Sequence, residues 1–417
     1  MTEKKFGILS LPVIVAALGY FVDVYDLLLF TIVKKSSLLD VGATDATILT
    51  DSTKVINWQM IGLLIGGIVW GILGDKKGRL SVLFGSIILY SIANILTGFV
   101  HTVDQYAASR FMAGLGLAGE LGAGITLVSE ILPKNKRGVG TSLVAGIGLF
   151  GAVFAYFTYQ LTHDWRMCYK IGGALGVALL LLRVRVAESG MFKELAMNSA
   201  VSKGNFFMFF NNTKRFKKYA FAVLIGLPNW YVVGILVNQS DRFGKLFFGS
   251  TTIDSGRSIM FAYAAAAIGD ILVGVVCQLF KSRKKAVFLY YLFTVISLIF
   301  FFSHYNRSDS NMYLICAALG FSTGFWGIFV TMGAEQFGTN LRATAATTIP
   351  NVVRGTLPLI NLLFLDLFQK SWGWTLIQSG VVTGVIVMTI TMIAFYFTEE
   401  TFSKDLNYLE TEEMLPQ

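Results

Sequence analysis

Four ionisable residues, Asp23, Glu120, Asp270 and Arg354, each fall near the middle of a long apolar stretch of the 417-residue chain. If these stretches cross a lipid bilayer, a charge at the bilayer centre costs about 2.5–3.5 kcal/mol even on lenient insertion scales. Such groups persist where they face water, an oppositely charged partner or a bound solute. Four of them at one depth indicate a polar site halfway across a membrane, where solutes and coupling ions bind in transporters.

Three carboxylates could carry a proton. Asp23 and Asp26 stand three residues apart, so both lie on one face of a helix. Two carboxylates this close cannot both ionise easily, so we expect one of them to bind a proton near neutral pH. Glu120 is a third candidate for proton coupling. The alternatives are fixed ion pairs, with Arg354 neutralising the two aspartates and Arg110 neutralising Glu120.

Arg354 could bind an anion. It lies in the segment IPNVVRGTLPLIN, between Pro350 and Pro358, which interrupt helical hydrogen bonds and favour a kink. Its guanidinium could hold a carboxylate or phosphate through two parallel hydrogen bonds, or it could bridge to Asp23 or Asp26. Other side chains that could contact a solute, although each is more often used in packing, are Arg110, Tyr25, Asp270, Asn229, Trp230, Trp326 and Asn361.

The elements that carry these residues are apolar segments. The chain is 54% hydrophobic and 14% charged, with a mean hydropathy of +0.64, whereas soluble domains contain about 25% charged residues. A membrane-spanning helix needs about 20 apolar residues. Segments of that kind are predicted at 7–33, 56–74, 80–100, 104–131, 138–161, 168–187, 219–240, 257–280, 286–303, 312–336, 342–366 and 374–397. The predicted fold is an all-α membrane protein with twelve transmembrane helices. We expect the third, sixth, ninth and twelfth to face lipid, because their interiors lack ionisable groups.

The two halves of the chain resemble each other. Glu130 and Arg137 have the same spacing as Glu335 and Arg342, which follow 205 positions later. Two pseudo-symmetric bundles of six helices in the same orientation are expected of a parallel repeat. We predict a first bundle at 1–190, a cytoplasmic linker at 191–218, a second bundle at 219–400 and a cytoplasmic tail at 401–417. Basic residues gather in the loops on the side of both termini, so both termini are predicted to be cytoplasmic.

A known family shares the loop between the second and third segments. GILGDKKGRL resembles the signature loop of the major facilitator superfamily, G-x-L-x-D-x-x-G-R, with Gly71, Asp75, Gly78 and Arg79 in place. SEILPKNKRG is similar to a pattern of its sugar-porter branch, and so are ESGMF after the sixth segment and TEETF after the twelfth. The resemblance implies a conformational latch that also includes Glu130, Arg137, Glu188, Glu335, Arg342 and Glu399.

The first segment narrows the resemblance. GYFVDVYDLLLF is similar to the first-helix motif of the Pht-type phosphate:proton symporters, in which the acid matching Asp23 is implicated in proton coupling. The tyrosine that contacts phosphate in that family is replaced here by Leu121, and a seventh-helix acid by Gly234. Metabolite:proton symporters share much of the remaining pattern. The resemblance therefore implies proton-coupled symport of a small organic anion or zwitterionic metabolite, with phosphate or sugar symport and a non-transporting receptor as alternatives.

Other classes of protein find no support in the sequence. The phosphate-binding motif of ATP-driven pumps, G-x-x-x-x-G-K-[ST], is absent. His101, His163 and His304 lack metal-ligand spacing, so we expect no metal site, no cofactor and no enzymatic activity. The net charge of +9 lies mostly in short loops, which favours membrane topology over nucleic-acid binding. We expect a monomer in contact with lipid, located in a bacterial inner membrane.

Overall fold

The computed structural model describes residues 7–183, 204–303 and 308–410. Within these residues, twelve helical segments are long and apolar enough to cross a membrane, as the sequence predicts. The first, α1 (Leu11–Asp40), contains 30 residues. At 1.5 Å per residue it extends over about 45 Å, more than the roughly 30 Å of a hydrocarbon core. The chain is therefore an all-helical, twelve-span protein over the described ranges.

The first six spans form one bundle. Most are single helices, whereas the fourth span is interrupted at Ala118 and Gly119 and so consists of two helices. After α1, the spans are α2 (Ile48–Lys77), α3 (Arg79–Thr97), α4 (Val103–Leu117) with α5 (Glu120–Ile131), α6 (Arg137–Thr162) and α7 (Trp165–Arg183).

The second six spans form the other bundle, and three of them are interrupted. The short helix η1 (Phe206–Phe209) precedes the seventh span, which consists of α9 (Thr213–Leu224), α10 (Leu227–Tyr231) and the π-helix η2 (Val232–Val237). The short helix α11 (Ser240–Phe248) leads to α12 (Ser255–Phe280) and α13 (Arg283–Phe302). The last three spans are α14 (Asp309–Ser322) with α15 (Trp326–Glu335), α16 (Arg342–Gly355) with α17 (Leu357–Asn361) and the π-helix η3 (Leu362–Ser371), and α18 (Leu376–Phe397).

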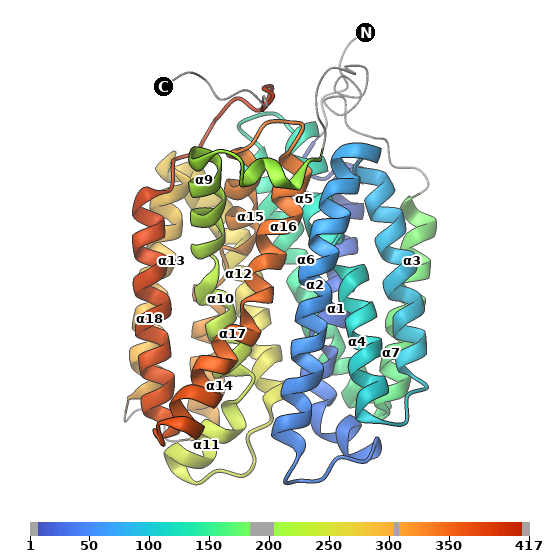
Figure 1. The fold of residues 1–417 in the computed structure, drawn as a ribbon, viewed down its shortest axis with the longest axis vertical. Helices are drawn as coiled ribbons and strands as arrows, with labels where there is room; N and C mark the ends of the chain where they lie inside the picture. The colour runs from blue at the N-terminus through green and yellow to red at the C-terminus, as the bar shows by residue number, and fades with distance from the viewer. Residues whose placement is uncertain (1–6, 184–203, 304–307, 411–417) are drawn as a thin grey trace.

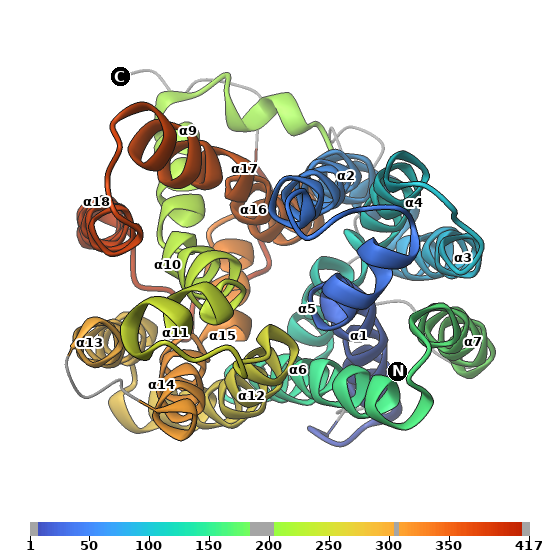
Figure 2. The same ribbon diagram turned by 90° about the horizontal axis from the view of Figure 1, so that it is seen from below.

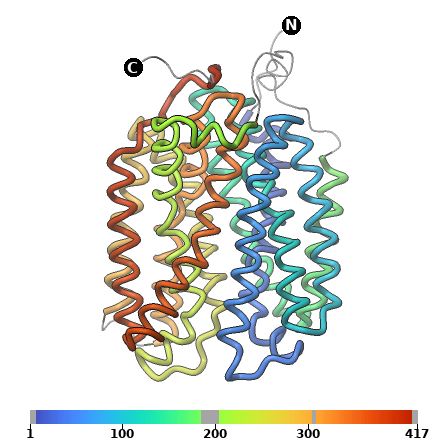
Figure 3. The backbone as a smooth tube through the Cα atoms, in the orientation of Figure 1, coloured from blue at the N-terminus to red at the C-terminus, as the bar shows by residue number. Residues whose placement is uncertain are grey.

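The bundles lie side by side (Figure 1). In Figure 1 the upper end is where α1 begins and α18 ends, and the lower end carries α11. The chain trace shows that α1 and α9 both start at the upper end, as a parallel repeat requires (Figure 3). The bundles meet where α2 packs on α16 and α6 packs on α12 (Figure 2).

The third, sixth, ninth and twelfth spans lie at the periphery, as α3, α7, α13 and α18 (Figure 2). They present large exposed apolar side chains, such as Ile92, Leu181, Ile299 and Ile393. Lipid-facing surfaces are apolar because no water is present to solvate polar groups. These four spans therefore form an outer apolar rim, at the position that the sequence predicts for them. The predicted linker is partly helical, because Asn212 accepts hydrogen bonds from the first backbone N–H groups of α9 and so caps that helix at Thr213.

The interruptions concentrate near the bundle interface. The break in the fourth span at Gly119 and the break in the tenth span at Gly324 are 205 positions apart, which matches the repeat seen in the sequence. A Cβ atom on Gly324 would lie 2.7 Å from the Cα atom of Gly269, so only glycine permits this approach of α12. Interrupted helices in transporters expose backbone groups and helix ends to the solute path.

Candidate functional site

A small central cavity of about 30 Å³ lies between the two bundles. Both bundles contribute to its wall, so a solute inside it would contact both. The lining comprises Tyr20, Val24, Leu27 and Leu149 of the first bundle and Asn229, Trp230, Val233, Ala262, Tyr263, Ala266, Gly320, Thr323, Trp326 and Arg354 of the second.

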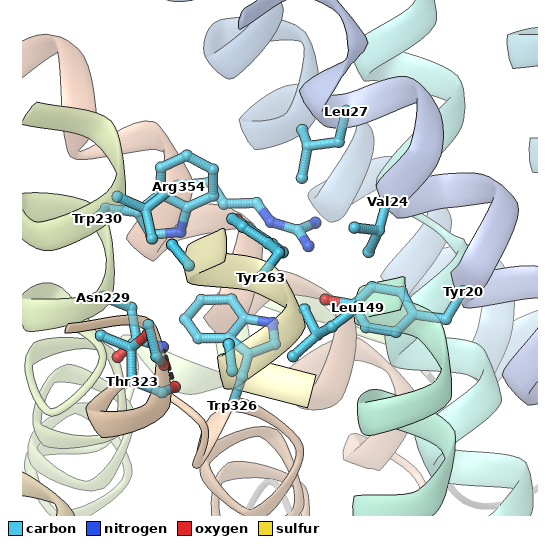
Figure 4. A pocket seen from close by; sticks show the side chains of 14 residues that line it. Tyr20, Val24, Leu27, Leu149, Asn229, Trp230, Tyr263, Thr323, Trp326 and Arg354 are labelled. Atoms are coloured by element: carbon cyan, nitrogen blue, oxygen red, sulfur yellow. Dashed lines mark hydrogen bonds between the residues drawn. The ribbon is translucent and has the colours of Figure 1, made fainter. Parts of the chain in front are cut away.

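Arg354 is the cationic group of the cavity. Its side chain extends from α16 toward Val24 of α1, among the rings of Tyr20, Tyr263 and Trp326 (Figure 4). The guanidinium donates to the side-chain oxygen of Asn351 at 3.0 Å and lies 5.8 Å from the Trp326 ring centroid. It is 1% exposed, and within the described residues it forms no ion pair and its Nε–H has no hydrogen-bond partner. The cavity therefore holds a buried cation that is not ion-paired with any carboxylate of the described residues.

An amide and several aromatic rings complete the wall. Asn229 donates from Nδ2 to the backbone carbonyl of Thr323 at 3.0 Å, while its Oδ1 atom has no partner among the described residues. It shares the short helix α10 with Trp230, and Pro228 occupies the first turn of that helix, where a missing N–H is tolerated. Tyr20 packs against Gly148, where a Cβ atom would lie 2.1 Å from its ring. The cavity thus combines flat apolar faces with a free amide acceptor.

Asp23 is a carboxyl group without a partner. It is fully buried in α1, next to the cavity residue Val24. Neither of its carboxyl oxygens has a hydrogen-bond partner within the described residues. Burying an unpaired ionised carboxylate is expensive, and such a group relieves that cost by binding a proton. Asp26, three residues further along α1, instead pairs with the cation Arg110.

Asp26 and Arg110 form a buried ion pair inside the first bundle. Their closest atoms, Oδ1 and Nη1, are 2.9 Å apart, and both side chains are fully buried. Arg110 also donates to Asn94 at 3.0 Å and stacks 5.1 Å from the centroid of Tyr169. Neither Arg110 nor Asp26 lines the central cavity. The structure therefore places the predicted contact residue Arg110, and the predicted proton carrier Asp26, in a fixed pair.

Glu120 pairs with Arg183, not with Arg110. The two side chains form a two-pronged contact at 2.6 and 2.9 Å, and Ser86 donates to Glu120 at 2.8 Å. A Cβ atom on Gly19, one turn before Asp23, would clash with this pair. The sequence interpretation missed Arg183, because its place at the end of the sixth span resembles that of an ordinary flanking cation.

Asp270 stabilises a helix break. Its carboxylate accepts from the backbone N–H of Gly327 at 2.9 and 3.3 Å, at the start of α15. The first N–H groups of a helix have no partner within the helix, and the helix dipole favours a negative charge there. Asp270 does not line the central cavity, so the structure gives this predicted contact residue a position in the wall behind it.

Two further predicted contact residues also lie away from the central cavity. The hydroxyl of Tyr25 donates to the backbone carbonyl of Cys168 at 2.8 Å, on the side of α7. Asn361 donates to Asn57 at 3.4 Å and lines a second cavity at the lower end. Of the predicted contact residues, the central cavity is lined by Asn229, Trp230, Trp326 and Arg354, to which the structure adds Tyr20 and Tyr263.

The signature loop joins the two bundles at the upper end. The carboxylate of Asp75 accepts from the backbone N–H groups of Ala343 and Thr344, at 3.1 and 2.8 Å, and from the Thr344 hydroxyl at 2.7 Å. These groups form the start of α16 in the other bundle. Gly71 permits the approach, because a Cβ atom there would lie 3.0 Å from the Cα atom of Thr344. Gly78, with φ of +99°, ends α2 in a conformation that favours glycine.

Buried ion pairs reinforce this junction. Arg79 contacts Glu130 at 2.8 Å and Asp75 at 3.4 Å within the first bundle. Arg342 of the second bundle contacts the same Glu130 oxygen at 3.2 Å. Arg137 donates to the backbone carbonyls of Leu132 and Lys404, at 3.3 and 3.5 Å. The upper end is therefore closed by charged groups from both bundles.

The second bundle has a related but shifted arrangement. Glu335 pairs with Arg283 at 2.6 Å. The repeat offset of 205 maps Arg79, the partner of Glu130, onto Lys284, so the pairing cation stands one position earlier than the repeat predicts. Glu399 forms a partly exposed pair with Lys218 at 3.2 Å. Glu188, the remaining latch residue inferred from the sequence, lies outside the described residues.

Glu400, one position beyond Glu399, caps the start of α13. It accepts from the hydroxyl of Ser282 and from the backbone N–H groups of Arg283 and Lys284, at 3.0 and 3.2 Å. Burial raises the pKa of the Glu400 carboxyl, but the hydrogen bonds from Ser282, Phe402, Arg283 and Lys284 outweigh burial and lower it overall.

Comparison with known proteins identifies the class. The sequence model of the Major Facilitator Superfamily matches residues 16–355. A protein of Haemophilus influenzae named for metabolite transport is 27% identical over 366 residues, which cover 85% of this chain and 88% of that protein. The niacin transporter NiaP of Acinetobacter baylyi is 24% identical over 368 residues, covering 80% and 81% of the two chains. The solved structure of the proton:xylose symporter XylE superposes with a TM-score of 0.75 at 15% identity, covering 95% of this chain and 97% of that one.

The chain belongs to the Major Facilitator Superfamily. It is an integral membrane transporter of a small molecule, in a family that transports solutes without enzymatic chemistry. No group of three or more His, Cys, Asp or Glu side chains within the described ranges is arranged to hold a metal ion.

Proposed function

We propose that the protein is a proton-coupled symporter of a small organic anion, which binds in the central cavity with its carboxylate on Arg354. The observation that carries the proposal is the burial of Arg354 without an ion pair to a carboxylate in the part of the chain that the structure describes. A buried arginine is normally paired, and its fork of N–H donors fits a carboxylate through two parallel hydrogen bonds. The solute then supplies the missing negative charge.

The lining favours a flat carboxylate among the possible anions. Trp230, Trp326, Tyr20 and Tyr263 offer ring faces, and planar solutes gain from stacking on such faces. The A. baylyi relative is named for niacin, an aromatic carboxylate. Inorganic phosphate and sugars would stack less well on these ring faces. Phosphate symport and sugar symport therefore rank below symport of an organic anion. A zwitterionic metabolite would place its carboxylate on Arg354 in the same way.

Asp23 is the proposed proton carrier. It lies next to the cavity residue Val24, and its carboxyl oxygens have no hydrogen-bond partner among the described residues, whereas Asp26 and Glu120 each pair with an arginine. A neutral, protonated Asp23 leaves the positive charge of Arg354 available to an anion, while an ionised Asp23 would compete with it. Binding of the proton and of the anion therefore favour each other, which is the requirement for symport.

The upper end is proposed to face the cytoplasm of a bacterial cell, with the protein in the inner membrane as a monomer. α1 begins and α18 ends at this end, which also carries basic loops such as that between α2 and α3, in agreement with the positive-inside rule. The structure then represents a state closed toward the cytoplasm. Asp75, Arg79, Glu130 and Arg342 hold that state together and must separate before the solute can leave inward.

The test is a pair of titrations on purified protein, with nicotinate and its uncharged amide as probes. Arg354→Gln should weaken nicotinate binding by tenfold or more, because charge-assisted hydrogen bonds contribute about 1.5–3 kcal/mol each. Binding of the amide should change little. Arg257→Gln, which removes an exposed arginine on α12, is the matched control. The proposal fails if no aromatic carboxylate binds the wild type, or if Arg354→Gln weakens the acid and the amide equally. Counterflow in proteoliposomes separates transport from mere binding by a receptor.

A further inference from the structure

A second cavity opens at the lower end and leads toward the central one. Its volume is about 330 Å³, and its charged lining residues are the cations Lys34, Lys35 and Arg242 and the acids Asp45 and Asp241. A narrow cavity of about 20 Å³ adjoins both of them. This narrow cavity shares Leu27, Trp230 and Val233 with the central cavity, and it shares Ile56 and Asn238 with the lower one. The three cavities therefore adjoin one another between the lower surface and Arg354, along a path that is constricted at the narrow cavity.

Lys34 lines the lower cavity and contacts Asn238, which lines both the lower and the narrow cavity. Its ammonium, near the end of α1, donates to the backbone carbonyl of Asn238 at 3.2 Å and to the hydroxyl of Ser255 at 3.4 Å. Both acceptors belong to the second bundle, Asn238 at the end of η2 and Ser255 at the start of α12. Lys34 therefore connects the bundles directly beside the mouth of the path.

The acceptors of Lys34 are neutral. Within the described residues Lys34 forms no ion pair, and the nearby acid Asp241 instead accepts from the Ser255 hydroxyl at 3.0 Å. Hydrogen bonds between an ammonium and a carboxylate are roughly twice as strong as those between neutral groups. An arriving carboxylate is therefore a better partner for Lys34 than the two oxygens that it now contacts.

The backbones of the two bundles also come close beside Lys34. The carbonyl that accepts from Lys34 belongs to Asn238, which caps the end of the π-helix η2. A Cβ atom on Gly256 of α12 would lie 3.1 Å from the Cα atom of Ile32 in α1. Asn238 ends η2, and the same short π-helix carries Val233 of the central wall. Releasing Asn238 thus frees the end of the element that narrows the path.

We propose that Lys34 is both the lower gate and the entry site for the carboxylate of the solute. The anion replaces Asn238 and Ser255 on the ammonium, the link between α1 and the second bundle is broken, and the path to Arg354 widens. An uncharged solute does not make this exchange, so selection for charge begins at the entrance. This inference rests on the proposed function, since it takes the same anion as its ligand.

The gate can be observed with a pair of spin labels across the lower end. Leu39→Cys on α1 and Leu246→Cys on α11 supply exposed positions, while the native Cys168, Cys277 and Cys316 are buried. In the labelled wild type, nicotinate should lengthen the distance between the labels, and nicotinamide should leave it unchanged.

Lys34→Met should abolish this response, because the distance is then long with or without nicotinate. The association rate constant for nicotinate should fall about tenfold, as expected when a charge at a binding entrance is removed. Lys370→Met, which removes an exposed lysine paired with Asp366 at the same end, is the control and should behave as the wild type.

Two results would overturn the inference. One is a label distance in Lys34→Met that matches the wild type and still responds to nicotinate. The other is an equal response of the wild type to nicotinate and nicotinamide. If either occurs while Arg354→Gln still weakens nicotinate binding selectively, the proposed function stands and only the gate fails.

Discussion

The two bundles hold their central charges in different ways. In the first bundle, Asp26 pairs with Arg110 and Glu120 pairs with Arg183, and all four side chains are buried. In the second bundle, Arg354 faces the cavity without an ion pair among the described residues. A buried charge that is already neutralised contributes to the scaffold, whereas one that is not neutralised is available to a ligand.

Asp23 is the exception in the first bundle. It belongs to the same helix as Asp26 but makes neither an ion pair nor a hydrogen bond within the described ranges. An acid of the first bundle, next to the cavity residue Val24, and a cation of the second bundle in the cavity wall are thus both without an ion pair among the described residues. This contrast suggests a division of labour, with the proton bound by the first bundle and the anion by the second.

The largest predicted effect breaks a fixed pair. Glu120→Gln leaves Arg183 buried without a counter-charge, and breaking a buried pair in this way costs about 3–5 kcal/mol. The detergent-solubilised variant should therefore unfold at a much lower temperature than the wild type, as measured by intrinsic fluorescence. Asp366→Asn removes an exposed pair with Lys370 and should change stability by at most about 1 kcal/mol. Equal stability of the two variants would contradict a scaffold role for Glu120.

A smaller effect is expected from the unpaired acid. Asp23→Asn should fold normally, because it removes no partner from any other group. In proteoliposomes the wild type should accumulate the anion by about tenfold per unit of pH gradient for each coupled proton. The variant should exchange the solute across the membrane without accumulating it. Accumulation by Asp23→Asn equal to that of the wild type would remove Asp23 from the coupling step.

The smallest effect concerns the upper end of the second bundle. Glu400→Gln should destabilise the protein by about 1 kcal/mol at neutral pH, because a helix cap loses its charge. The lowered pKa of Glu400 means that its contribution is fully present above the ordinary pKa of a glutamate, about 4.3. That contribution is lost as the pH falls through the lower, folded-state pKa. The difference in melting temperature between variant and wild type should therefore shrink in acid, and a constant difference would refute the cap.

Much of the fold could be predicted from the sequence because a membrane span is a long local signal. Twelve apolar segments, the repeat offset and the signature loop with Asp75 all follow from residues that are near one another in the chain. The depth of Arg354 within its span could also be predicted from the sequence. Depth along a helix needs only a count of residues at a fixed rise.

The direction in which each side chain points was harder to predict. Arg110 and Tyr25 have suitable depth, but rotation about the helix axis turns them into the first bundle. Arg183 reaches Glu120 only because its long side chain extends back from the end of α7. Tyr263 gave no sequence signal, since an aromatic residue in an apolar span resembles ordinary packing. These contacts depend on packing between helices that are distant in sequence.

The most direct test of the division of labour is the affinity for nicotinate measured between about pH 6 and about pH 8.5, over which the solute stays ionised. Wild-type affinity should fall as the pH rises, because the anion binds best when Asp23 holds its proton. The affinity of Asp23→Asn should stay constant over the same range. A variant that keeps the pH dependence of the wild type would show that the proton resides elsewhere, and the contrast between the two bundles would lose its functional meaning.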